Sequence, residues 1–342
     1  MRLQDFDYGL PKERIAQYPL PKRDDSRLMV LNRVEKKREN QKFPDLLNYL
    51  KTGDALVFND TKVVPALVAG KKEKTGGKVE CLLVERVADG IYKVLSRPSR
   101  GMKAGNRIVF DGSKLTAEVL ENQSQYQILH FNGIPDPESE LRRIGNIPLP
   151  PYIQRKSEPM DRERYQTIFA RAEGAVAAPT AGFHFTERLV EAIMTKGVEV
   201  IFVTLHVGPG TFLPVREEEI SKHSLWEESF CLSQSAAGRL NQAREQKRRI
   251  IAVGTTICRV LESSIDEKGK FQAREGKTSL FITPGFEFRA IDGLVTNFHL
   301  PKTTLLMLVS AFAGREWVLE SYQEAIRLGY RFYSYGDAML IL

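Results

Sequence analysis

Side chains that can transfer protons or bind anions follow five short apolar runs of this sequence. The runs are 55–58, 175–178, 198–204, 250–253 and 294–296. The residues that come after them include Asn59, Asp60, His184, His206, Gly208, Gly210, Thr255, Thr256, Arg259, Asn297 and His299. In an open α/β sheet, ligands bind beyond the carboxyl ends of the strands. If the five runs are strands of one sheet, these side chains meet in one site.

Three of the five histidines of the chain are among these residues. A histidine titrates near neutrality, and proton transfer by a positioned side chain contributes typically ~100- to 10,000-fold in rate. For any one of them, a buried histidine with satisfied hydrogen bonds is the alternative. We predict that at least one acts in proton transfer or substrate binding, and we rank His206 and His184 above His299. Their wide spacing is unlike H-E-x-x-H, so no metal site is predicted.

Other residues at these strand ends suit a polar or anionic ligand. Thr255 and Thr256 stand between a strand and a helix, where backbone N–H groups and hydroxyls can hold an anion. Arg259 can pair with a carboxylate or phosphate. Each feature has an alternative interpretation. Thr255 can be an ordinary helix cap, Arg259 can form a surface ion pair, and the G-x-G at 208–210 can simply make a turn. The predicted cofactor-binding residues are Arg259, Thr255, Thr256, Gly208, Gly210, Asn59 and Asn297.

The elements that must position these residues alternate between strands and helices. Thr186 and Ser233 can cap helices over 187–196 and about 234–247, and further helices are expected at about 161–171, from 255, and over 303–312 and 317–328. Additional strands are expected at 27–31, 280–283 and 339–342. Because the strands are almost wholly apolar, the pattern predicts an α/β fold with a mainly parallel sheet covered by helices on both faces.

Residues 62–132 have a different character. Six short runs separated by Gly-, Asp- or Asn-containing turns indicate a small β-barrel, inserted into an α/β catalytic domain made of 1–61 and 133–342. This insert holds 12 Lys and Arg against 7 Asp and Glu, so it carries most of the chain's net charge of +7. A basic surface suits a polyanion, although a solvated lysine-rich face is the alternative.

Composition excludes several classes of protein. With 342 residues, 42% hydrophobic and 27% charged, the chain is an ordinary globular protein of about two domains. The beginning of the chain has no apolar segment typical of a signal peptide, and no run reaches the ~20 residues of a membrane helix. The three cysteines lack metal-site spacing. The absence of G-x-G-x-x-G and P-loop patterns argues against Rossmann dehydrogenases, P-loop NTPases and ordinary methyltransferases. We expect a cytoplasmic monomer without metal.

Long motifs along nearly the whole chain resemble one family. They are residues 5–19 with 23–28, 58–66, 76–83, 161–185, 204–212 (TLHVGPGTF), 253–262 (VGTTICRVLE), 296–306 (TNFHLPKTTLL) and 330–337 (YRFYSYGD). In this order they resemble the S-adenosylmethionine:tRNA ribosyltransferase-isomerase family of queuosine synthesis.

The resemblance implies an unusual transfer reaction. The ribosyl part of S-adenosylmethionine would move onto 7-aminomethyl-7-deazaguanine at the tRNA wobble position and rearrange to give epoxyqueuosine, while adenine and methionine leave. A base for the acidic 5′ carbon and a proton donor for adenine would come from His184, His206 and His299, with Asp60 and Glu228 as alternatives. Arg259 with Thr255 and Thr256 would hold the methionine carboxylate. The predicted tRNA-binding residues are Lys71, Lys72, Lys74, Arg97 and Arg100.

The sequence departs from the family pattern at two positions. Leu67 stands where the pattern has Arg, and Trp226 stands where it has His. A catalytically impaired tRNA-binding homologue is therefore the second hypothesis, and an aromatic ring at 226 suits either base stacking or core packing.

Overall fold

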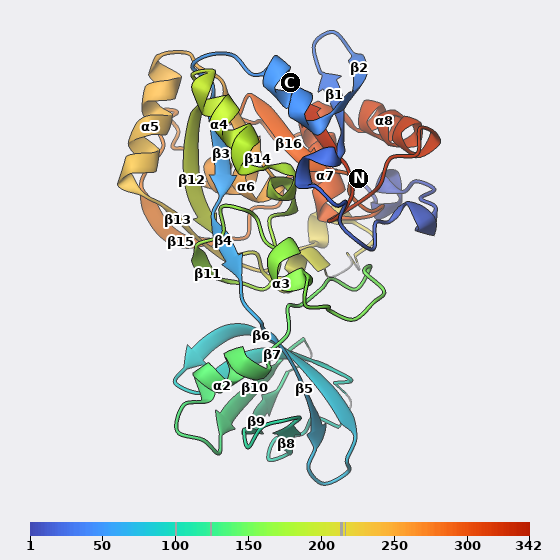
Figure 1. Ribbon diagram of the computed structural model, residues 1–342, viewed down its shortest axis with the longest axis vertical. Coiled ribbons are helices and arrows are strands. Elements are labelled where there is room, and N and C mark those ends of the chain that lie inside the picture. Colours follow the sequence, from blue (N-terminus) through green and yellow to red (C-terminus); the bar gives the residue numbers. More distant parts are fainter. Residues whose placement is uncertain (100, 124, 213–214, 216) are drawn as a thin grey trace. The chain divides into compact units, whose positions relative to one another are not determined.

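The computed structural model describes residues 1–99, 101–123, 125–212, 215 and 217–342. Within this part the chain forms two compact units (Figure 1). The first comprises Met1–Lys62, Pro150–Arg155 and Glu163–Leu342, and the second comprises Val63–Leu149 and Lys156–Arg162. The predicted domain limits, 1–61 with 133–342 and 62–132, stay a prediction.

The first unit is built on a nine-stranded sheet in the order β15-β13-β12-β3-β14-β16-β17-β1-β2. Its strands are β1 (Arg27–Asn32), β2 (Lys37–Lys42), β3 (Ala55–Asn59), β12 (Glu199–Leu205), β13 (Glu228–Leu232), β14 (Ile250–Val253), β15 (Arg274–Thr278), β16 (Gly293–Asn297) and β17 (Ala338–Ile341). The central strands β12, β3, β14 and β16 run parallel. Antiparallel partners flank them, so the sheet is mixed.

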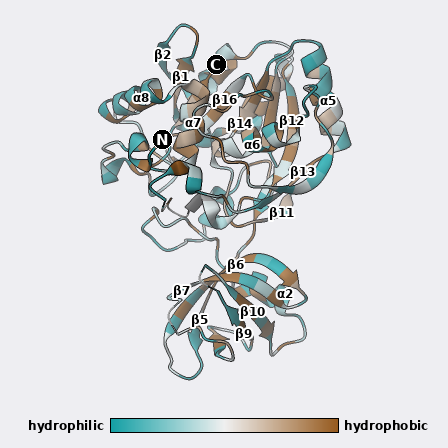
Figure 2. Cartoon of the chain, turned by 180° about the vertical axis from the view of Figure 1, so that it is seen from behind, coloured by the Kyte–Doolittle hydropathy of each residue, from teal (hydrophilic) through white to brown (hydrophobic). Residues whose placement is uncertain are grey.

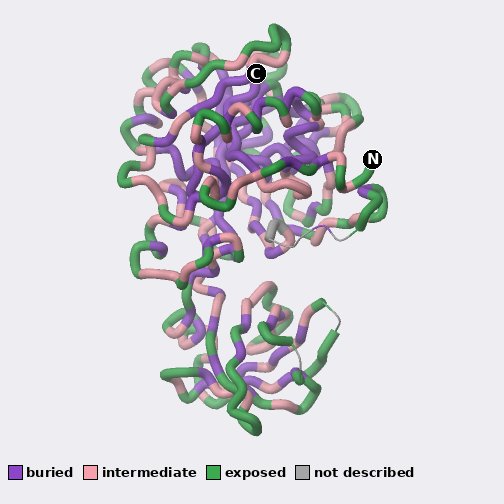
Figure 3. Tube along the Cα trace, turned by 90° about the vertical axis from the view of Figure 1, so that its right-hand side faces the viewer, coloured by how far each residue is buried: buried purple, intermediate pink, exposed green. Residues whose placement is uncertain are grey.

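Helices cover both faces of this sheet, because its strands are apolar on both sides. Leu28 and Val30 pack on one face with α1 (Leu46–Tyr49) and α4 (Glu187–Thr195). Met29 and Leu31 pack on the other with α5 (Gln234–Glu245), α6 (Thr255–Ser264), α7 (Thr304–Ala313) and α8 (Arg315–Arg327). Figure 2 shows hydrophobic residues along the central strands and hydrophilic residues on α5 and α8, and Figure 3 shows that the middle of this unit is buried. The predicted α/β class is confirmed.

Three helices begin at the capping residues that the sequence contains. The hydroxyls of Thr186, Ser233 and Thr303 accept hydrogen bonds from the backbone N–H groups of Leu189, Ala236 and Leu306. Each such cap contributes about 1 kcal/mol to helix stability. These caps fix the start of α4, α5 and α7, and the helices predicted behind Thr186, behind Ser233 and from residue 303 are confirmed.

Three predicted elements are wrong. The strand expected at 175–178 lies instead at β11 (Ala172–Ala175), which pairs with β4 (Thr61–Val63) outside the main sheet. Residues 280–283 are not a strand, and the strand lies at Arg274–Thr278 instead. The apolar side chains of 280–282 pack into the core from a loop that leads to Pro284, which has no N–H to donate to a ladder. The helix expected over 161–171 is only α3 (Asp161–Arg164), because the Thr167 hydroxyl accepts from the Phe169 N–H and turns the chain.

The second unit contains a closed six-stranded barrel in the order β10-β7-β6-β5-β8-β9. Its strands are β5 (Leu67–Lys72), β6 (Lys78–Ala88), β7 (Ile91–Arg97), β8 (Arg107–Phe110), β9 (Thr116–Asn122) and β10 (Gln127–Asn132). Alternate side chains such as Val68, Ile108 and Leu129 fill its interior. Helix α2 (Pro137–Ile144) follows, and β4 (Thr61–Val63) and β11 (Ala172–Ala175) are short strands outside both sheets. The predicted barrel is confirmed.

Candidate active site

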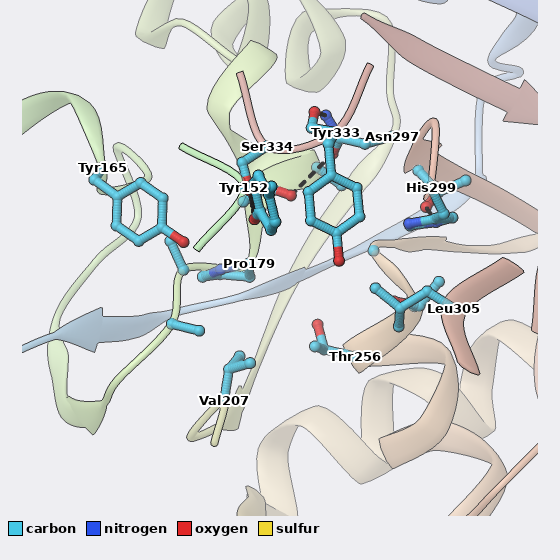
Figure 4. Close-up of a pocket in the computed structure, with 17 residues that line it drawn as sticks. Tyr152, Tyr165, Pro179, Val207, Thr256, Asn297, His299, Leu305, Tyr333 and Ser334 are labelled. Atoms are coloured by element: carbon cyan, nitrogen blue, oxygen red, sulfur yellow. Dashed lines mark hydrogen bonds between the residues drawn. The ribbon is translucent and has the colours of Figure 1, made fainter. Parts of the chain in front are cut away.

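A cavity opens at the carboxyl ends of the parallel strands of the first unit (Figure 4). Its walls come from residues 177–181 after β11, Val207 after β12, residues 254–256 after β14, and Asn297 and His299 at the end of β16. Segments far from these strand ends contribute Tyr152, Tyr333 and Ser334. The volume of the cavity is about 60 Å³. The cavity lies where an α/β sheet binds ligands.

The amino end of helix α6 forms part of this cavity. Gly254 turns the chain from β14 into the helix at φ 95°, a conformation that glycine adopts without steric cost. No side chain caps the helix at Gly254, and Thr255 and Thr256 line the cavity at its first turn. The first backbone N–H groups and the positive end of the helix dipole therefore favour an anionic group at this wall.

The two predicted asparagines hold strand ends together. The Asn59 amide donates to the Leu205 carbonyl at 3.0 Å, and its oxygen accepts from the Thr61 and Leu205 N–H groups. Asn59 is buried behind the cavity and does not line it. Asn297 does line it, and its amide donates to the Tyr333 carbonyl at 3.1 Å while its oxygen accepts from the Thr180 hydroxyl at 3.1 Å.

His299 is the one predicted histidine that lines this cavity within the described chain. Its Nε2 lies 2.9 Å from the Thr296 hydroxyl, and its Nδ1 makes no hydrogen bond to any described residue. Burial lowers the pKa of His299 to about 3, so the ring is neutral at physiological pH. The backbone of His299 is held on both sides, because its N–H donates to the Tyr322 hydroxyl and its carbonyl accepts from the Tyr8 hydroxyl.

His184 lies in a different environment. Its Nδ1 is 2.7 Å from the Ser26 hydroxyl and its Nε2 is 3.1 Å from the Asn297 amide nitrogen, so both ring nitrogens are bonded. The ring packs on Phe43 with 4.9 Å between centroids. Burial, with smaller contributions from Arg331 and Arg23, lowers the pKa of His184 to about 3. This histidine faces a separate small pocket, and its bonds are those of a structural residue.

His206 is less buried than His184 and His299, and one of its ring nitrogens is bonded. Its Nδ1 is 2.8 Å from the Thr61 hydroxyl, and its Nε2 has no partner in the described part of the chain. Burial lowers the pKa of His206, and the Asp60 carboxylate opposes that shift. The backbone of Gly174 lies flat against the ring, since a Cβ there would be 2.9 Å from ring atoms. His206 is thus held with one open nitrogen, but its side chain is not among those lining the cavity.

Arg259 lies one turn into α6 and faces a second, smaller cavity. Its guanidinium NH1 is 2.5 Å from the Glu228 Oε2, and its Nε donates to the Leu280 carbonyl at 3.0 Å. Glu228 also accepts from the Gly208 N–H at 2.9 Å, so this ion pair fixes the turn after His206. Both charged side chains are buried, and the remaining nitrogen of Arg259, Nη2, has no hydrogen-bond partner among the described residues.

The second cavity is largely apolar. Trp226, Phe281, Leu305 and Leu308 are among its lining residues, and Gly210 approaches Trp226 closely. Leu305 also lines the first cavity, so the two are neighbours. The structure therefore brings Thr255, Thr256, Asn297 and His299 together and places Gly210 and Arg259 in the adjoining cavity.

Sequence reasoning missed the aromatic wall of the first cavity. Tyr152 lies in a Pro-rich segment, and Tyr333 lies in the motif at 330–337. Neither residue follows a predicted strand, so strand ends alone do not predict this wall. Their rings meet edge-on with 3.9 Å between centroids.

The predicted basic residues of the second unit gather around one end of the barrel. Lys71 and Lys78 are paired across β5 and β6, Lys72 is close to Gly101, and Lys74 and Arg97 are exposed. Lys71 lies 3.6 Å from Asp111, an exposed and weak pair. Arg100 lies outside the described residues.

The described residues contain neither a group of potential metal ligands nor a helix suited to crossing a membrane. No three His, Cys, Asp or Glu side chains within these ranges are grouped so as to hold a metal ion. No helix there is both long enough and apolar enough to cross a membrane.

The two buried histidines predict a pH-dependent stability. Both have pKa values of about 3 in the folded chain against 6.5 when exposed, so the unfolded chain binds protons that the folded chain does not. The free energy of unfolding should therefore fall as the pH drops from about 6.5 towards 3, by up to about 1.4 kcal/mol per pH unit for each histidine. Urea denaturation of the wild-type chain and His184→Gln between pH 7 and 4.5 measures this. The variant should show the shallower slope, and equal slopes would refute the assignment.

Comparison with known proteins places the chain among related sequences. It matches the family model described as queuosine biosynthesis protein over residues 3–341. The S-adenosylmethionine:tRNA ribosyltransferase-isomerase of Halothermothrix orenii is 49% identical over 344 residues, and that of Staphylococcus haemolyticus is 48% identical over 345, each covering all of both chains. The crystal structure of S-adenosylmethionine tRNA ribosyltransferase from Thermotoga maritima is 39% identical, with a TM-score of 0.56 over 99% of this chain and 100% of that one.

Proposed function

This chain belongs to the queuosine biosynthesis protein family, and from that premise we propose that it transfers and isomerises the ribosyl group of S-adenosylmethionine onto 7-aminomethyl-7-deazaguanine at the tRNA wobble position. The products are epoxyqueuosine-tRNA, adenine and methionine. The family and enzyme class predicted from the motifs are confirmed by relatives that match along the whole chain. The observation that carries the proposal is a cavity at the strand ends, lined by residues of those motifs.

The two adjoining cavities suit the two halves of S-adenosylmethionine. The first combines flat aromatic walls from Tyr152 and Tyr333 with polar groups at the start of α6, which fits an adenosine. The second combines apolar walls with a guanidinium nitrogen of Arg259 that bonds no described residue, which fits the methionine chain and its carboxylate. Arg259 keeps its predicted role at this carboxylate, with Gly210 in the same cavity. Thr255, Thr256 and Asn297 line the first cavity and are proposed to contact the adenosine instead, whereas Gly208 and Asn59 support the walls.

Proton transfer is proposed for the histidines with an open ring nitrogen. The sulfonium acidifies the adjacent ribose 5′ carbon, so the reaction needs a neutral base, and departing adenine needs a donor. Burial lowers the pKa values of His299 and His206, so both rings favour the neutral form. The catalytic role predicted for His184 is replaced in this proposal by a structural one, since both of its ring nitrogens are already bonded.

The basic end of the barrel is proposed to bind tRNA. Neutralising Lys71, Lys72 and Lys74 together to Gln should weaken tRNA binding, because each lost phosphate contact removes up to ~0.9 from the log–log salt slope on a duplex. Binding of unmodified tRNA measured at several salt concentrations checks this. Neutralising the exposed Lys247, Lys268 and Lys270 of the first unit is the charge-matched control. A salt slope equal to that of the wild-type chain would show that the barrel lysines are only a solvated face.

The experiment that tests the function is an assay of small-molecule products. The chain is incubated with S-adenosylmethionine and tRNA carrying 7-aminomethyl-7-deazaguanine, and free adenine is measured. Adenine released in proportion to modified tRNA is the expected result. S-adenosylhomocysteine in place of adenine would instead indicate a methyltransferase.

A tRNA-binding homologue with impaired catalysis is the second candidate function. Trp226 and Leu67, which depart from the family pattern, motivate it. Trp226 lines the second cavity beside Gly210, so its effect would fall on the proposed methionine half of the site. tRNA binding without any adenine release would favour this candidate.

A further inference from the structure

Tyr333 has a backbone conformation that is unusual for its side chain. Four non-glycine residues of the described chain have positive φ, and Tyr333, at 71°, is the only one of them that is buried. The other three are lysines at 36, 247 and 302. A bulky residue in the left-handed region is an outlier, and such outliers cluster at functional sites, where the surrounding structure holds them.

Three backbone hydrogen bonds hold Tyr333 in this conformation. Its N–H donates to the Phe298 carbonyl at 3.0 Å, and its carbonyl accepts from the Asn297 amide at 3.1 Å and from the Gly336 N–H at 2.8 Å. Phe298 and Asn297 belong to the strand-end segment that leads to His299. The strained residue is therefore fixed to the same segment that lines the cavity.

This conformation directs the Tyr333 side chain into the first cavity. Figure 4 shows the hydroxyl pointing towards Thr256 and Leu305, into the open space. The ring is buried edge-on against Tyr152, and the His299 ring lies 6.3 Å away between centroids. The Tyr333 hydroxyl makes no hydrogen bond within the described ranges, whereas the Tyr152 hydroxyl lies 2.6 Å from the Ser334 hydroxyl.

The chemical state of the hydroxyl follows from its surroundings. Burial raises the pKa of Tyr333 above its usual range, so at neutral pH the group is a donor. The hydroxyl borders the open space of the cavity, where a bound ligand can supply its acceptor. The aromatic walls around it suit a planar heterocycle, and the ring nitrogens of a purine are acceptors.

We infer that Tyr333 is a catalytic residue whose hydroxyl donates a hydrogen bond to a ring nitrogen of the adenine of S-adenosylmethionine. This inference rests on the proposed function and deepens it. As the bond between adenine and ribose breaks, its electron pair passes to the base, and a fixed donor stabilises the negative charge that develops there. The tyrosine keeps its proton throughout, and the proton that departing adenine takes up comes from the histidine proposed as the donor.

The test removes one oxygen atom. Tyr333→Phe should lower kcat for adenine release by about 100-fold or more, the usual effect of losing one such donor, and should change the KM for S-adenosylmethionine by only a few-fold. Tyr330→Phe is the matched control, because it removes a buried tyrosine hydroxyl that lies outside both cavities and already donates to the Asn40 side chain at 2.8 Å. That variant should keep kcat within a few-fold of the wild-type chain.

Substrate analogues separate a donor from a merely structural tyrosine. Two analogues of S-adenosylmethionine, with carbon in place of adenine N3 or of adenine N7, each lack one acceptor. With the wild-type chain, one of these analogues should react as slowly as S-adenosylmethionine does with Tyr333→Phe. With that same analogue, Tyr333→Phe should be no slower than the wild-type chain. Equal slowing of all three substrates by Tyr333→Phe, or no slowing, would overturn the inference alone. No adenine release by the wild-type chain would overturn the proposed function and the inference with it.

Discussion

His299→Gln and His206→Asn are each expected to slow adenine release by at least about 100-fold, the lower end of what a positioned proton-transfer group contributes. The substitutions are chosen from the geometry. Gln at 299 keeps a nitrogen near the Nε2 that meets Thr296 and removes the open Nδ1. Asn at 206 keeps a group near the Nδ1 that meets Thr61 and removes the open Nε2. Single-turnover assays of adenine release measure the effect.

His184→Gln is the control for this prediction. Because both nitrogens of His184 are bonded within the chain, its loss should act on stability, and adenine release per folded molecule should stay within a few-fold of the wild-type rate. If His299→Gln and His206→Asn both keep near-normal rates, the base lies elsewhere. Asp60 and Glu228 would then be the next residues to replace.

Arg259→Ala is expected to lower the free energy of unfolding by about 3–5 kcal/mol, because it leaves the buried Glu228 carboxylate without its counter-charge. It should also weaken binding of S-adenosylmethionine by roughly 1.5–3 kcal/mol if the guanidinium holds the methionine carboxylate. Urea denaturation gives the first quantity, and calorimetry on the folded fraction gives the second.

A double variant separates these two effects. Arg259→Met with Glu228→Gln removes both charges, so most of the lost stability should return, since a buried pair replaced on both sides is often neutral. The weak binding of S-adenosylmethionine should remain. Normal affinity in the double variant would remove Arg259 from the ligand site and leave it as the residue that fixes the Gly208 turn.

The sequence predicted the framework of this site because local signals decide it. Apolar runs, capping hydroxyls and strand ends point to Thr255, Thr256, Asn297 and His299, and these four residues line one cavity. His206 was expected there too, but neighbouring residues of an extended chain point to opposite sides, and Val207 takes the cavity side. A prediction from strand ends alone therefore does not distinguish His206 from Val207.

Long-range contacts explain what the sequence did not predict. Arg259 forms its ion pair with Glu228, which lies on β13. The hydrophobic periodicity of the sequence does not reveal this polar strand, and β13 pairs only with its antiparallel neighbours. Tyr152 and Tyr333 are 181 positions apart, and no local pattern joins them. Tyr152 and Tyr333 come together only in the complete fold, next to the strand ends.

One measurement tests the central claim most directly. The chain is incubated with modified tRNA and S-adenosylmethionine labelled with carbon-13 either in the ribose or in the methyl group, and the wobble nucleoside is then analysed by mass spectrometry. The account predicts that all the ribosyl carbons appear in the nucleoside and that the methyl label does not. A nucleoside that carries the methyl label, or neither label, would contradict it.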